Sequence, residues 1–172
     1  MQEKEQLLAA LSMEMIQYYQ KDPRRIQHFL KVHSLARLIG QQEKLDSEIQ
    51  FILEVAALVH DIGIKQAEKK YGKCGGKLQE QEGPGEAFKM LKRLGLENAI
   101  IERVCYLVGH HHTYNNISGK DYQILVEADF LVNFYEDQTN PAAIKAVYDK
   151  IFVTETGKRL CRILYGEGGQ AE

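Results

Sequence analysis

Apolar residues recur along most of this chain at the three- and four-residue spacing of amphipathic α-helices. The spacing predicts helices over about residues 3–20, 23–41, 46–61, 83–94, 97–112, 121–136, 141–149 and 155–165. No alternating run bounded by turn residues indicates a strand. The predicted fold class is therefore all-α: a single-domain helical bundle of about six to eight helices spanning residues 1–172. Its core is expected at about 20–136, with a C-terminal helical extension at about 141–165.

Several predicted helix starts carry the expected capping residues. Asp22 can cap a helix whose first turn holds Pro23, and Asp46 can cap the next helix. Pro84 and Pro141 are likewise expected in the first turns of their helices. The capping residues therefore support the helix starts that the apolar spacing predicts.

Glycines mark the expected helix ends and the least regular part of the chain. Gly40, Gly63 and Gly95 are expected where helices stop. Residues 63–82, rich in glycine and lysine, are expected to be the main irregular segment. The tail GEGGQAE is expected to fray.

Histidines of the second predicted helix can be placed by projection. Val32, Leu35 and Ile39 form one apolar stripe, and extending it back one turn reaches His28. His33 lies roughly 140° away around the helix. His28 is therefore expected to point inward and His33 is not.

The run FILEVAALVH is apolar nearly all round, which predicts a central buried helix that ends in His60 and Asp61. An aspartate near a helix C-terminus costs about 0.3–1 kcal/mol, because the helix dipole there is already negative. A cation beside the Asp61 carboxylate would offset that cost. Gly63 can then terminate the helix.

Two later helices also direct polar side chains inward. Apolar stripes of the fifth helix lead to His111 and His112, whereas His110 follows a more polar face. On the next helix Asp129 is flanked by Leu125 and Val132. A buried carboxylate needs a partner or a metal, because burying it alone is expensive.

Imidazole and carboxylate groups that meet in one interior indicate a metal site. They suit Mn, Fe, Co, Ni or Zn, while Mg accepts fewer histidines. Without cysteine among them, a structural zinc site is not expected. A mixed His/Asp site with open positions suits hydrolysis. The alternative is an all-α structural domain whose inward polar groups are only hydrogen-bonded.

Composition narrows the function classes further. The chain is 44% hydrophobic and 27% charged with a net charge of -2, so neither a nucleic-acid-binding nor a membrane-binding surface is expected. Cys74, Cys105 and Cys161 are far apart, so neither a disulfide framework nor a zinc cluster is expected. The N-terminus lacks the layout of a signal peptide, and a cytoplasmic location is expected.

The ordered set of motifs resembles the HD-domain superfamily of metal-dependent phosphohydrolases. That family carries a His on one helix, a His-Asp doublet at the end of another and an Asp on a later one. Here RIQHFLKVHSLARLIG carries His28, AALVHDIG carries His60 and Asp61, and ILVEADFLVN carries Asp129. The resemblance covers about residues 20–136.

The resemblance implies that His28, His60, Asp61 and Asp129 hold one divalent metal, which positions and activates a water against phosphorus. Asp61, as a bridging or proton-accepting carboxylate, and Lys65, as a phosphate clamp, become candidate catalytic residues. The implied function is metal-dependent hydrolysis of a small phosphate ester or nucleotide. A non-catalytic nucleotide-binding regulatory module on the same fold is the alternative. Homodimerisation stays open.

Departures from the family pattern concern a second metal. Family members with two metals often have a His before a Gly-Pro pair and a His-His pair on the next helix. This chain has Glu82 before its Gly-Pro, while His111 and His112 match the pair. Glu82, His111 and His112 are therefore candidates for a second metal or for phosphate binding. The Gly-Tyr-Pro signature of the cyclic-di-GMP branch is absent, so that substrate is not expected.

Overall fold

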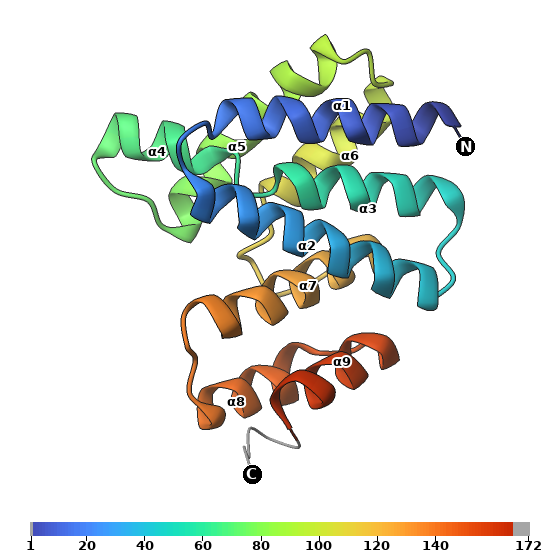
Figure 1. The fold of residues 1–172 in the computed structure, drawn as a ribbon, viewed down its shortest axis with the longest axis vertical. Helices are drawn as coiled ribbons and strands as arrows, with labels where there is room; N and C mark the ends of the chain where they lie inside the picture. The colour runs from blue at the N-terminus through green and yellow to red at the C-terminus, as the bar shows by residue number, and fades with distance from the viewer. Residues whose placement is uncertain (1, 167–172) are drawn as a thin grey trace.

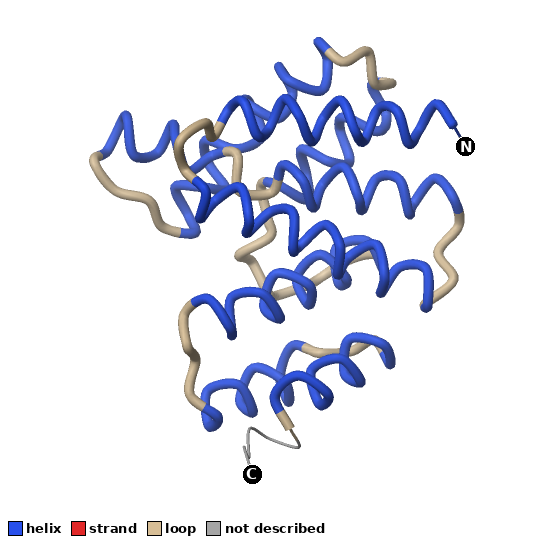
Figure 2. Tube along the Cα trace, viewed as in Figure 1, coloured by secondary structure: helices blue, strands red, loops and turns tan. Residues whose placement is uncertain are grey.

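The computed structural model describes residues 2–166, which form nine α-helices and no strand (Figures 1 and 2). This confirms the predicted all-α class. The helices are α1 (Gln2–Tyr18), α2 (Pro23–Gln42), α3 (Ser47–Val59), α4 (Gly63–Tyr71), α5 (Gly76–Arg93), α6 (Asn98–Val108), α7 (Lys120–Glu136), α8 (Pro141–Ile151) and α9 (Glu155–Tyr165). Apart from Gly166, the tail that was expected to fray lies outside the described residues.

Helix starts follow the capping residues of the sequence. The Asp22 side chain accepts a hydrogen bond from the Arg25 backbone N–H, and Pro23 opens α2. Asp46 accepts from two backbone N–H groups in the first turn of α3. Each carboxylate satisfies N–H groups that the helix itself leaves without partners. The predicted starts of both helices are confirmed.

Residues 63–82, which were expected to be irregular, are mostly helical in α4 and α5, and this prediction was wrong. Gly63 begins α4 instead of ending α3, and Pro84 lies inside α5. A side chain at Gly63 would collide with the Gln79 carbonyl oxygen and lie 2.7 Å from the Gly83 nitrogen. Glycine at this position therefore allows two helices to approach closely, and the sequence pattern alone does not show that.

Helix α3 occupies the centre of the core, as its apolar sequence predicted. All its residues from Phe51 to Val59 are buried, Glu54 included. It packs against α1, α2, α6 and α7, while α5 packs against α4 and α6. Figure 1 shows α3, α2 and α7 as successive layers below α1. The polar residues at the end of α3 are thus surrounded by helices.

The ends of α1, α3 and α7 and the start of α2 lie at one end of the molecule (Figure 1). After α3, residues 60–62 form a turn. Two tyrosines near the end of α1 hold this turn: the Tyr18 hydroxyl donates to the Ile62 carbonyl at 3.2 Å, and the Tyr19 hydroxyl donates to the Asp61 carbonyl at 2.7 Å. These bonds hold the turn of residues 60–62 against the end of α1.

The C-terminal helices are joined to α7 by a buried carboxylate. Glu127 Oε1 accepts hydrogen bonds from the backbone N–H groups of Val153 and Thr154 at 2.7 and 2.9 Å. The Thr154 hydroxyl donates to the other oxygen. This network fixes the connection between α8 and α9 against the core.

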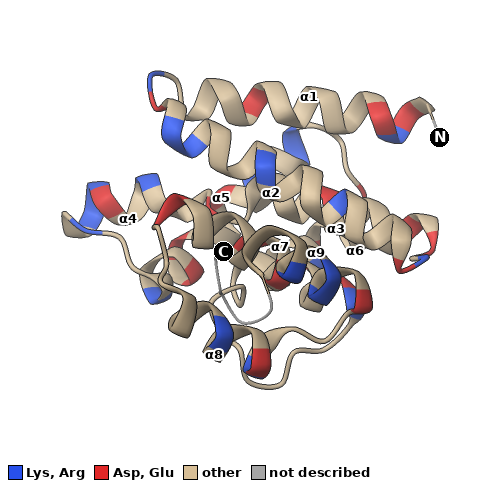
Figure 3. Cartoon of the chain, turned by 60° about the horizontal axis from the view of Figure 1, so that its bottom comes forward, with Lys and Arg blue, Asp and Glu red and all other residues tan. Residues whose placement is uncertain are grey.

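Acidic and basic residues are both spread over the helices in the view of Figure 3, in keeping with the net charge of -2. Among the described helices, none is both long enough and apolar enough to cross a membrane.

Candidate metal centre

Four predicted ligands come together at the end of the molecule where α2 starts and α3 and α7 end. The Nε2 atom of His28 on α2 lies 3.2 Å from His60 Nε2 and 3.2 Å from Asp129 Oδ1 of α7. It also lies 3.4 Å from Asp61 Oδ2, and His60 Nε2 lies 3.5 and 3.6 Å from the same two carboxylates. His60 is fully buried, and His28 and Asp129 are nearly so. Sequence projection thus placed the inward histidine of α2 correctly.

Hydrogen bonds at the far side of each ring determine which nitrogen faces the cluster. His60 Nδ1 donates to the Ala57 carbonyl at 2.9 Å, and His28 Nδ1 donates to the Glu136 carboxylate at 3.0 Å. Both acceptors lack a proton to give, so each Nδ1 carries a hydrogen, and in the neutral form of each ring Nε2 has a lone pair. Two neutral rings with their Nε2 atoms 3.2 Å apart would repel, so this contact requires either a proton on one ring or a metal ion between them.

The spacing of these atoms suits one divalent ion. Ligand atoms bound at about 2.1 Å to a common ion lie about 3.0 Å apart at right angles and about 3.4 Å apart at tetrahedral angles. The observed separations run from 3.2 Å to 3.6 Å. His28, His60 and Asp61 therefore form a potential metal-binding group. Asp129 lies beside both histidines but outside that group, so it would have to move toward Asp61 to bind the same ion.

A second group of candidate ligands shares Asp61 with the first. Asp61 Oδ2 faces His28 and His60, while its Oδ1 lies 3.4 Å from His111 Nε2. His111 Nδ1 lies 2.8 Å from the Val108 carbonyl oxygen, and the buried Nε2 has no hydrogen-bond partner among residues 2–166. Asp61, His111 and His112 form a potential metal-binding group of their own. Asp61 thus turns one oxygen to each group.

The pKa values of His60, Asp61 and Asp129 show that this group of ligands favours a positive charge. Burial by itself lowers the pKa of His60, but the carboxylates of Asp61 and Asp129 outweigh it and raise that pKa to about 9. Burial acts to raise the pKa of both carboxyls, yet the surrounding histidines hold each pKa well below its usual value. Both carboxylates stay ionised, and a cation of some kind must balance them.

His112 differs from the other histidines of the centre. Its Nε2 lies 2.8 Å from Gln79 Oε1, and its backbone N–H donates to Glu80 Oε1 at 3.0 Å. Burial first, and then the neighbouring His111, lower its pKa to about 4. His112 is therefore neutral at pH 7, the form in which imidazole binds metals.

Glu82, a candidate for the second metal or for phosphate, takes part in other contacts. Its carboxylate is paired with Lys70 and accepts hydrogen bonds from Tyr71 at 3.0 Å and from Gln81 at 3.2 Å. Neither potential metal-binding group among the described residues includes it. The α5 residues that contact the histidine pair are instead Gln79 and Glu80, which precede Glu82 in the same helix.

Lys65 is also directed elsewhere. It is exposed on α4, and its Nζ donates to the Tyr18 carbonyl at 2.8 Å and lies 4.8 Å from the centre of the Tyr18 ring. His33 contacts Glu54, and His110 stacks on Tyr106, as expected for two histidines predicted not to face the centre. Lys65 therefore contacts α1 in this structure.

Two residues of α7 support the ligands, and sequence reasoning missed both. Asn133 Nδ2 donates to Asp129 Oδ1 at 2.9 Å, and Glu136 orients His28. Lys31 Nζ lies 2.6 Å from the second Glu136 oxygen. Asp129, Asn133 and Glu136 are spaced i, i+4 and i+7, so they share one helix face. From this spacing, the sequence alone could have indicated that Asn133 and Glu136 lie near Asp129.

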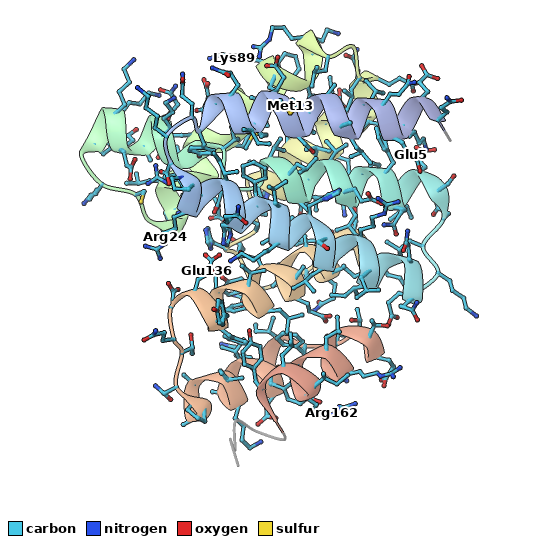
Figure 4. All side chains as sticks on the ribbon, in the orientation of Figure 1. Glu5, Met13, Arg24, Lys89, Glu136 and Arg162 are labelled. Carbon is cyan, nitrogen blue, oxygen red and sulfur yellow. The ribbon has the colours of Figure 1, made fainter. Side chains whose placement is uncertain are left out.

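Two cavities open beside the centre and share Asp61, Asn133 and Asp137. One, of about 360 Å³, is also lined by Gln79, His112, Phe130 and Phe134. The other, of about 320 Å³, is lined by Asp22, Arg24, Arg25, His28 and Glu136. Figure 4 shows Arg24 and Glu136 on the same side of the molecule, at the start of α2 and the end of α7. Asp61 is thus accessible to a small molecule from two directions.

Comparisons with known proteins identify the family of this chain. Residues 25–152 match the HD domain. A crystal structure of a predicted HD superfamily hydrolase from an uncultured Thermotogales bacterium has a similar fold, with 26% sequence identity and a TM-score of 0.63. The match covers 94% of this chain and 84% of that one. Among curated proteins, no relative of this chain is found. The matched segment contains the whole His28, His60, Asp61 and Asp129 group, and the chain therefore belongs to the HD domain family.

Proposed function

We propose that this chain is a metal-dependent phosphohydrolase that cleaves a small phosphate ester or nucleotide. The observation that carries the proposal is the pair of Nε2 atoms of His28 and His60, held 3.2 Å apart beside the carboxylates of Asp61 and Asp129. Membership of the HD domain family supports it, as does the similar fold of a predicted HD superfamily hydrolase.

A divalent ion bound here would lower the pKa of a water and neutralise charge on the phosphoryl group. The chain's own residues hold the ligands in place for that chemistry. Ala57 and Glu136 fix the rings of His60 and His28, and Asn133 fixes the Asp129 carboxylate. These partners leave the ligand atoms directed at one point before any ion arrives.

Asp61 lies between the two groups of ligands, one oxygen toward each. Because its pKa is held well below the usual value, the carboxylate stays ionised and is a weak proton acceptor. A bridging role therefore suits Asp61 better than the role of general base. Asp61, His111 and His112 are proposed to hold a second divalent ion or a phosphate oxygen.

The roles of Lys65 as a phosphate clamp and of Glu82 as a ligand for a second metal or phosphate remain predictions from the sequence. To reach a phosphate at the metal centre, the Lys65 ammonium would have to leave the Tyr18 carbonyl. To bind a metal, the Glu82 carboxylate would have to leave Lys70.

The test is a substrate panel run with one metal at a time. The protein is stripped of metal, reloaded with Mn, Fe, Co, Ni, Zn or Mg, and assayed on phosphomonoesters, phosphodiesters and nucleotides. At least one metal and substrate class should show turnover. His60→Ala and Asp61→Asn should each lower that turnover at least about 100-fold, the effect of losing one group that stabilises the transition state.

His33→Ala is the matched control, because His33 is on α2 like His28 but contacts Glu54 instead of the centre. It should keep the parent's turnover. Metal binding without turnover on any substrate, together with nucleotide affinity unchanged in His60→Ala, would replace the proposal with a regulatory module. Absence of metal binding would leave only a structural domain.

A further inference from the structure

A third cavity, of about 360 Å³, lies between α2, α7 and α9. Helix α2 contributes Leu35, α7 contributes the buried Leu131 and Val132, and α9 contributes Leu164. None of its described lining residues is a candidate metal ligand. Figure 1 shows these three helices one below the other. The cavity is thus formed where α9 packs on the core, and it is separate from the metal centre.

The lining of this cavity is mostly apolar, and part of it is exposed. Leu164 is 52% exposed and Tyr135 is 73% exposed. The Tyr165 hydroxyl donates to the Leu131 carbonyl, so the polar group of that ring is already satisfied. Single exposed apolar residues are normal on a protein surface, but apolar residues that line one concave site together indicate a binding site.

Lys31 is the one charged residue among the described residues that line this cavity. Its Nζ lies 5.8 Å from the centre of the Tyr135 ring, and its side chain is 43% exposed. Ser34, about one turn further along α2, adds a hydroxyl group to the lining. An apolar surface with a single ammonium at its edge complements a molecule that has an apolar chain and one negative charge.

Lys31 already has one acidic partner, which it would share with an incoming anion. Its Nζ lies 2.6 Å from Glu136 Oε1, and Glu136 Oε2 accepts a hydrogen bond from His28 Nδ1 at 3.0 Å. An ammonium has three N–H donors, so Lys31 can bind a second acceptor while it contacts Glu136. A carboxylate in the cavity would therefore compete for Lys31 with the residue that orients His28.

We propose that this cavity binds a free monocarboxylate with an unbranched alkyl chain, as in a fatty acid. The carboxylate lies at Lys31, and the chain lies against Leu131, Val132 and Leu164. The cavity volume falls within the range of about 300–1,000 Å³ found for small-molecule sites. Residues 167–172, EGGQAE, have no large apolar side chain that could fill it instead. This binding goes beyond the proposed hydrolysis and needs no metal.

Chain length tests the apolar part of the site. Isothermal titration with hexanoate, octanoate and decanoate, at concentrations below micelle formation, should show one bound molecule per protein chain. Each CH₂ group that enters the cavity should tighten binding about 4-fold, so decanoate should bind about 15-fold more tightly than octanoate. Absence of binding, or an affinity that does not depend on chain length, overturns the inference.

The neutral alcohol decanol tests the contact with Lys31. Lys31→Met keeps an unbranched apolar side chain without the charge. It should lower the ratio of decanoate affinity to decanol affinity about 2- to 5-fold, the scale of one exposed ion pair. Glu136→Gln removes the competing charge and should raise the same ratio. If neither variant changes the ratio, the carboxylate does not lie at Lys31 and the inference fails.

Two neighbouring residues of α9 test the location. Leu164→Asp places a carboxylate in the cavity lining and should lower decanoate affinity at least about 10-fold, the scale of losing one apolar side chain. Ile163→Asp is the matched control, because Ile163 is 67% exposed and lies outside the lining. It should keep the parent's affinity. Melting temperatures check that both variants are folded, and equal decanoate affinities in the two folded variants would exclude this cavity.

Other occupants of the cavity have their own outcomes. Sedimentation measures the oligomeric state: a dimer that Leu164→Asp dissociates and that binds no decanoate would mean that a second copy covers the cavity. A variant without residues 167–172 that binds decanoate much more tightly would mean that this segment occupies it. Either result overturns the inference, whereas a monomer with the same decanoate affinity with or without that segment supports it.

Discussion

The three buried histidines of the centre are oriented by two different kinds of contact. His60 and His111 each donate from Nδ1 to a carbonyl three residues earlier in the chain, of Ala57 and Val108. His28 instead donates to Glu136, which comes from another helix. The orientation of His28 is therefore the one that depends on a tertiary contact.

Replacing Glu136 should weaken metal binding without removing a ligand. Glu136→Ala frees the His28 ring to rotate and should lower metal affinity about 10- to 100-fold, the usual effect of losing a ligand's supporting partner. Glu136→Gln, whose amide oxygen still accepts from Nδ1, should recover part of the loss. Isothermal titration with Mn²⁺ or Zn²⁺ measures both, and Asp149→Ala, an acidic surface change on α8, is the control. Equal affinity in all variants would contradict the role of Glu136.

Close packing between helices places the His-Asp turn. Gly63 directly follows this turn of residues 60–62, and its backbone lies against the backbone of Gln79 and Gly83 on α5. The same α5 segment contacts His112 through Gln79. The approach of α4 to α5 therefore helps to set where Asp61 and the histidine pair lie.

Gly63→Ala should destabilise the protein where Gly85→Ala does not. A methyl group at Gly63 meets backbone atoms that cannot move away, which costs about 1–3 kcal/mol of overpacking. Gly85 in the same α5 helix has no atom within 4 Å of a built Cβ, so Gly85→Ala should be neutral or stabilise by up to about 1 kcal/mol. Urea unfolding of the two variants gives the comparison, and equal midpoints would rule out the packing argument.

The buried Glu127 of α7 holds the connection between α8 and α9 in place. Removing it leaves the backbone N–H groups of Val153 and Thr154 without partners. Glu127→Ala should therefore cost about 3–5 kcal/mol of unfolding free energy. Glu155→Ala, which removes an exposed acidic residue in the first turn of α9, should cost no more than about 1 kcal/mol. Chemical denaturation measures the unfolding free energy of both variants. A smaller loss in Glu127→Ala than in Glu155→Ala would contradict this role of Glu127.

At the scale of the whole molecule, the candidate ligands join α2, the end of α3 and α7 at one point. An ion bound there would add bonds between three helices that already pack against one another. Metal binding should therefore stabilise the native state as a whole.

The stabilisation by a bound metal ion depends on the metal concentration relative to the Kd. At a metal concentration 100 times the Kd, the unfolding free energy should rise by about 2.7 kcal/mol. For a chain of this length the melting temperature should rise by about 5–10 °C. Chelation should reverse the shift, Asp61→Asn should reduce it strongly, and His33→Ala should keep it. Calorimetry with and without chelator provides the measurement. If no metal tested changes the melting temperature, the candidate centre does not bind a divalent ion.

Much of this arrangement follows from local pattern in the sequence. Apolar spacing and capping residues such as Asp22 and Asp46 predict helices correctly, because these signals act within one or two turns of the chain. Projection also distinguishes His28 from His33, since a ligand on an apolar helix face must point into the core. The ordered motifs around His28, His60-Asp61 and Asp129 also predict membership of the HD-domain family, which the family match confirms.

Only the tertiary structure decided the rest. Glu136 supports His28, Gln79 reaches His112, and Phe130 lines a cavity, because helices distant in sequence pack against one another. Lys65 lies one residue after the family's lysine position, and Glu82 stands where the family has a histidine. In the structure, Lys65 contacts Tyr18 and Glu82 contacts Lys70. Helix periodicity determines which face a side chain occupies. Which partner lies opposite that face depends on packing between helices, which no local pattern encodes.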